Sequence, residues 1–158
     1  MPIYMKYGDF KGSVTSANFK EQIELFSFSF GTARSIRFSD GRSKDRSADQ
    51  PMVQEITITK AMDAASPKLF TESIKGEGQS VDITVAAMIK DQVTEVAKYS
   101  LENTIVSSYS VGGGGGDMPT ETFTLNFTKV SFTFKSYDEK LTPKPETVSY
   151  DLSQAKTG

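Results

Sequence analysis

The sequence contains no cysteine, no histidine and no tryptophan among its 158 residues. Without cysteine, the chain can form neither disulfides nor thiolate nucleophiles. Without histidine, it lacks the usual general base of nucleophilic catalysis and the commonest transition-metal ligand. These absences exclude most hydrolase mechanisms and most metal centres, so we expect no metal and no other cofactor.

Neither sign of charge predominates, because 18 Lys and Arg face 20 Asp and Glu for a net charge of -2. Such a chain has no overall field that attracts nucleic acid or an anionic membrane. Residues 1–9 lack the basic start and apolar core of a signal peptide, and no apolar run approaches the roughly 20 residues of a membrane helix. We expect no nucleic-acid partner, no membrane insertion, and a cytoplasmic protein whose export needs no signal peptide.

Alternation of apolar and polar residues dominates the chain, as in Phe26 to Phe30 and Val81 to Val85. This pattern is typical of antiparallel sheet with one buried face. The phase changes near Thr128–Lys129, which predicts a β-bulge that bends a long strand, as a closing barrel requires. We expect the last strand at Thr147 to Leu152, after a turn at Pro143 to Pro145.

One helix is well signalled, at about residues 66–75. Ser66 can act as its N-cap, and Pro67 suits the first helical position, where a missing N–H costs nothing. Gly76 can end the helix. A helix of this length is marginal alone, so we expect it to pack beside the sheet.

Two loops stand out. Residues 35–50 form a long loop with few residues that could be buried, and Gly112 to Gly116 form a five-glycine turn between two strands. The run is followed by Asp117 in place of the lysine of a phosphate-binding loop, so it predicts a flexible hairpin tip. The long loop carries both signs of charge, at Arg37, Asp40, Arg42, Lys44, Asp45 and Arg46.

The charged loop has two other interpretations. Its basic residues could bind phosphates, with Phe38 offering a ring to a base, but the aspartates weaken that field. The aspartates could suggest calcium, but their spacing lacks the calcium-loop pattern. Mixed charges suit a protein contact that needs a defined register, so we favour a solvated or interface-forming loop.

Catalysis by carboxylates stays open in principle, because any two of Asp63, Glu72, Glu95 and Glu121 could meet in the fold. None of them sits in a local catalytic signature, and no G-x-S-x-G motif is present. We therefore predict that the chain is not an enzyme.

Three stretches of the chain resemble the Hcp (haemolysin-coregulated protein) family of type VI secretion systems. They are Ile3–Lys6 with Gly8–Asp9 and Gly12, Thr59–Lys60 followed by Met62–Phe70, and Leu125–Val130 with Tyr137–Asp138 and Val148–Leu152. The resemblance covers the full length, and its specificity lies in the order and spacing of the stretches.

The resemblance implies a subunit of homohexameric rings that stack into the inner tube of a contractile injection machine. It implies spike proteins, sheath proteins and cargo effectors as partners, and secretion when the sheath contracts. The six charged residues of the long loop are then candidates for contacts between stacked rings. A phage-type tail tube protein and a ligand-binding β-domain are the alternatives.

Taken together, these features predict one domain over residues 1–158 that is mainly β. We expect a single small antiparallel β-barrel of two curved sheets, with one flanking helix at about 66–75 and a long extended loop at about 35–50.

Overall fold

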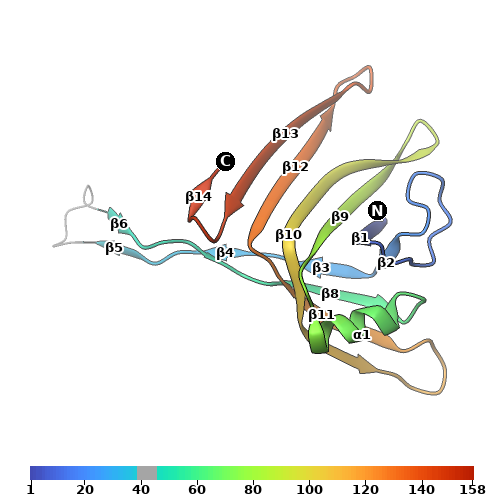
Figure 1. Cartoon of the computed structure of the whole chain (residues 1–158). Coiled ribbons are helices and arrows are strands. Elements are labelled where there is room, and N and C mark those ends of the chain that lie inside the picture. The colour runs from blue at the N-terminus through green and yellow to red at the C-terminus, as the bar shows by residue number, and fades with distance from the viewer. Residues whose placement is uncertain (39–45) are drawn as a thin grey trace.

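The computed structural model describes residues 1–38 and 46–158, and the side chains of residues 1–37 and 49–158. Antiparallel strands dominate, and one helix, α1 (Ser66–Lys75), lies beside them (Figure 1). The strands of the body are β1 (Ile3–Tyr7), β2 (Ile23–Leu25), β3 (Ser27–Ser29), β8 (Ile56–Ala61), β9 (Gln79–Ile89), β10 (Gln92–Gly112), β11 (Thr120–Asn126), β12 (Lys129–Tyr137), β13 (Pro143–Asp151) and β14 (Lys156–Thr157).

The long strand β10 belongs to two sheets. Its first half pairs with β9 and β12, and its second half pairs with β11. One sheet runs β2-β1-β9-β10-β12-β13-β14, and the other runs β10-β11-β8-β3. The prediction of a mainly β fold with two curved antiparallel sheets and one flanking helix is confirmed. In the described residues none of the three end strands, β2, β14 and β3, pairs with another of them, so no continuous ladder closes the barrel.

The predicted change of phase near Thr128–Lys129 is a change of sheet and not a bulge inside one strand. β11 ends at Asn126, β12 begins at Lys129, and the N–H of Thr128 bonds to the carbonyl of Glu102 in β10. The interruption of regular pairing lies instead in β10, whose register with β9 shifts near Asn103, a residue with a φ of 51°. This irregularity separates the half of β10 in one sheet from the half in the other.

Alternation explains which residues form the core between the sheets. Every second residue of β8 is buried, as is every second residue of β11. Leu69 of α1 is fully buried against the same core, so the helix covers one side of it. The largest apolar members are Met5, Tyr7, Ile23, Ile56, Ile58, Leu69, Ile83, Leu101, Phe123 and Leu125.

The helix spans the predicted residues, but its N-cap is not the predicted one. Ala65 occupies the N-cap position, and Ser66 is already helical. The Ser66 hydroxyl accepts the N–H of Asp63 at 2.9 Å, while Asp63 Oδ1 accepts the N–H of Ala65 at 3.0 Å. Asp63 and Ser66 therefore hold the entry into the helix together.

No helix in the described part of the chain is long and apolar enough to cross a bilayer.

The last long strand is longer than predicted. β13 begins at Pro143, so Pro143 and Pro145 lie inside the strand, and the turn falls at Asp138 to Thr142. The Asp138 carboxylate accepts the N–H of Thr142 at 2.8 Å and stabilises that turn. Proline predicts a turn, but a strand at the edge of a sheet also tolerates it.

The described residues on the two sides of the long loop, 32–38 and 46–53, form an arm that projects from the body (Figure 1). The arm is a two-stranded ribbon, in which β4 (Thr32–Ala33) pairs with β7 (Met52–Val53) and β5 (Ile36–Phe38) pairs with β6 (Arg46–Ala48).

The five-glycine turn joins β10 to β11. A Cβ added to Gly112, Gly114, Gly115 or Gly116 would meet no atom within 4 Å, so the fold itself does not require glycine there.

Candidate assembly surfaces

The arm holds two of the six residues predicted to act between rings, Arg37 and Arg46. Arg37 lies in β5, and its guanidinium is 3.4 Å from the Asp49 carboxylate. Both side chains are more than half exposed, so this ion pair adds little stability. Arg46 begins β6 opposite Phe38. The other four candidates, Asp40, Arg42, Lys44 and Asp45, lie outside the described residues, so the structure does not test this hypothesis.

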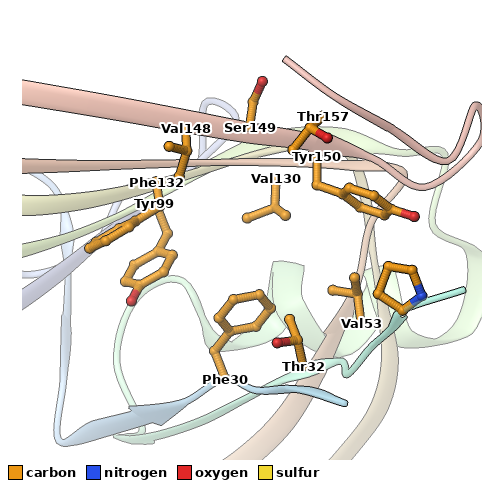
Figure 2. Close-up of a pocket in the computed structure, with 11 residues that line it drawn as sticks. Phe30, Thr32, Val53, Tyr99, Val130, Phe132, Val148, Ser149, Tyr150 and Thr157 are labelled. Atoms are coloured by element: carbon orange, nitrogen blue, oxygen red, sulfur yellow. The ribbon is translucent and has the colours of Figure 1, made fainter. Parts of the chain in front are cut away.

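An apolar groove of about 320 Å³ opens where the arm meets the body (Figure 2). Phe30 and Val53 line it from the arm side, and Phe132, Val148 and Tyr150 line it from β12 and β13. Figure 2 shows these side chains facing one another across the opening. The groove is a surface on which another apolar group could be buried.

The sequence did not reveal the groove. Tyr99 and Phe132 stack at its wall, with ring centroids 4.7 Å apart, although the alternation in their strands predicts the inward face for both. Alternation assigns a residue to a face of its strand. It does not say whether another layer of the protein covers that face, and here part of the face is left open.

A second cluster is buried next to α1. Lys60 of β8 and Glu121 of β11 are both 0% exposed, and Lys60 Nζ is 2.6 Å from Glu121 Oε2. Lys60 Nζ also donates to Asp63 Oδ1 at 2.9 Å and to the carbonyl of Ala61 at 2.7 Å. The Tyr109 hydroxyl donates to the other oxygen of Glu121. The cluster joins β8, β10 and β11 to the residues that begin α1.

The four carboxylates considered for catalysis do not converge. Asp63 and Glu121 share one cluster, but both bind Lys60 there. Glu95 pairs with Lys135 at 3.4 Å. Burial raises the pKa of Glu72, whose Oε2 is buried and has no hydrogen-bond partner within the described part of the chain. In the described residues no three or more carboxylates gather as a metal ion would need.

Ionisation of Glu121 depends on its partners. Burial alone would raise the pKa of this carboxyl, but hydrogen bonds from Lys60 and Tyr109 and the charge of Lys60 lower it below the ordinary 4.5. Burial and the neighbouring Glu121 carboxylate raise the pKa of Tyr109. The tyrosine therefore stays protonated and keeps donating to the carboxylate.

This lowered pKa predicts acid sensitivity. Because the folded-state pKa of Glu121 lies below its unfolded value, the pair stabilises the fold fully above about pH 4.5 and progressively less as the pH falls below it. Urea unfolding across that range should show a falling free energy of unfolding in the wild type. The fall should be smaller in Glu121→Gln, whose amide does not titrate, and an equal fall in both proteins would contradict the assignment.

Comparisons with known proteins agree with the fold. A family model described as "Type VI secretion system effector, Hcp" matches residues 4–134. The chain is 29% identical to Protein hcp1 of Pseudomonas aeruginosa over 135 aligned residues. The alignment covers 84% of this chain and 82% of that protein.

Solved structures share the same fold. One described as "Structure of a type six secretion system protein" has a TM-score of 0.90 at 23% identity and covers 99% of both chains. Hcp1 from Salmonella typhimurium has a TM-score of 0.78 at 20% identity, over 99% of this chain and 98% of that one. Since the family match spans well over half of the sequence, the chain belongs to the Hcp family of type VI secretion system proteins.

Proposed function

We propose that this chain is a structural, non-catalytic subunit of the type VI secretion tube, acting as one domain over residues 1–158. Copies form homohexameric rings, and the rings stack into the inner tube. The tube assembles in the cytoplasm, leaves the cell on firing without a signal peptide, and carries effectors in its lumen. Spike and sheath proteins are its other partners. Membership of the Hcp family carries this proposal.

Two surfaces support assembly. A ring of identical subunits needs two unlike patches, one of which meets the other on the next copy. The open groove beside β13 supplies apolar area that a second copy can bury, and the arm supplies a projecting charged surface. We propose that the groove takes part in the ring contact and that the arm acts between rings.

The mass of the purified protein tests ring formation directly. Light scattering during gel filtration should give the mass of a hexamer of 17.3 kDa chains, and negative-stain microscopy should show annuli. A chain that stays monomeric at high concentration, with no annular particles, would defeat the proposal. A monomer that binds a small apolar ligand would support the alternative of a ligand-binding β-domain.

Charge reversal of Arg37 tests stacking. We expect Arg37→Glu to reduce tube formation while hexamers persist, because the exposed pair with Asp49 contributes little to the fold. The control is Arg37→Glu with Asp49→Arg, which restores an ion pair within the arm. If the arm acts on the next ring, this control also lacks tubes. Microscopy of concentrated rings gives the readout, and wild-type tubes in Arg37→Glu would contradict the role of Arg37.

A further inference from the structure

The outer edge of β13 has almost no free hydrogen-bond donors. β13 pairs with β12 along its whole length on one side, and on the other side β14 is its only partner among residues 1–38 and 46–158, at Tyr150 and Asp151. A strand with an unpaired edge is a template on which another chain can add a strand. The donors that point outward from β13 therefore decide whether this edge is open.

Two hydrogen bonds establish which residues of β13 point outward. The N–H of Ser149 bonds to the carbonyl of Gly158 at 3.1 Å, away from β12. The N–H of Leu152 bonds to the carbonyl of Thr128 at 2.8 Å, on the β12 side. Because N–H groups alternate between the two edges of an antiparallel strand, the odd-numbered residues of β13 direct theirs outward.

Both prolines of β13 are at odd positions. Pro143 and Pro145 have no N–H, so each removes a donor from the outer edge and none from the pairing with β12. Ser149 and Asp151 are opposite Gly158 and Lys156 on the β14 side. Of the outward positions, only Thr147 keeps a donor that neither proline nor β14 removes.

The turn into β14 is held by a side chain of β13 itself. Asp151 Oδ1 accepts the N–H of Ser153 at 2.9 Å and the N–H of Gln154 at 3.1 Å. A hydrogen bond from the Ser153 hydroxyl lowers the pKa of Asp151. The carboxylate therefore stays ionised and fixes the turn that returns β14 along the edge.

We propose that the outer edge of β13 is closed to strand addition by Pro143, Pro145 and β14, so that a second copy joins through side chains and not through a shared ladder at this edge. The inference does not rest on ring formation, since the same closure would protect a solitary chain from edge-to-edge association. In a tube it would keep the sheets of neighbouring subunits from merging.

The first test is a pair of proline variants one residue apart. Thr147→Pro removes an outward donor and should keep the wild-type circular dichroism spectrum and nearly the wild-type melting temperature. Val148→Pro removes a donor that points toward β12 and should lower the melting temperature far more. Equal effects of the two changes would overturn the assignment of the outward positions.

The second test opens the edge. Pro143→Thr with Pro145→Thr returns two outward donors, and Lys156→Pro removes an N–H of β14 that points toward β13. We expect this triple variant to keep its β-rich circular dichroism but to lose the wild-type mass in light scattering, with a shift to larger, concentration-dependent species. A triple variant with the wild-type mass at every concentration would overturn the proposal.

A rescue variant separates edge pairing from misfolding. Adding Thr147→Pro to the triple variant blocks the middle of the reopened edge again and should restore the wild-type mass. Large species that persist after this addition would point to misfolding and count against the proposal. The readout is the change of mass relative to the wild type, so it works equally if the wild type is a monomer and the proposed function fails.

Discussion

Replacing Lys60 by methionine should destabilise the fold by about 3–5 kcal/mol, because it leaves a buried carboxylate without its counter-charge. Glu121 is 0% exposed and bonds to Lys60 at 2.6 Å, so water cannot replace the ammonium group. Urea unfolding at a fixed protein concentration measures the loss, since assembly would add to the apparent stability.

Two variants control this prediction. Lys98→Met removes a lysine whose ion pair with Asp82 is about one-third exposed, and it should cost about 1 kcal/mol or less. The double change Lys60→Met with Glu121→Leu should cost much less than the sum of its single changes, because no unpaired charge then remains buried. A loss below about 1 kcal/mol in Lys60→Met alone would show that the pair does not anchor the fold.

Placing a lysine in the groove at Val148 should abolish rings while the subunit stays folded. The Val148 side chain is 53% exposed in the isolated chain, so the charge is tolerated there. If a second copy covers the groove, the ammonium group must lose its water, which costs several kcal/mol at each contact of a ring. Light scattering should then report a monomer in place of a hexamer, with unchanged circular dichroism.

Val111→Lys is the matched control. Val111 is 51% exposed and also lies in a strand, but it is not part of the groove lining. It should leave the hexamer intact. Hexamers in Val148→Lys would contradict a role for the groove in the ring contact, and would favour a different surface for the second copy.

The sequence alone was sufficient for the fold class and for the inward face of most strands. Alternation is a local property, since successive side chains of a strand point to opposite faces whatever the partner strand is. Two charged residues follow the same alternation. Lys60 continues the inward series of Ile56 and Ile58, and Glu121 begins that of Phe123 and Leu125, so both charges stood at core positions.

Proline and serine predict local structure less well, because each has two physical roles. Proline is common in turns and also in edge strands, and only the pairing of β13 shows that Pro143 and Pro145 serve the second role. Ser66 suits an N-cap, but the chain enters α1 one residue earlier, and its hydroxyl accepts the N–H of Asp63 instead. Local preference is overridden where tertiary contacts offer another partner.

The sequence by itself determined that this is an antiparallel β protein with one helix and a resemblance to the Hcp family. Only the tertiary structure decided that Lys60 and Glu121 are buried and pair across 61 residues, that an apolar groove lies open on the isolated chain, and that the prolines of β13 direct their nitrogens to the outer edge. The reason is physical: alternation acts between neighbours in the chain, whereas pairing depends on which distant strands meet and in what register.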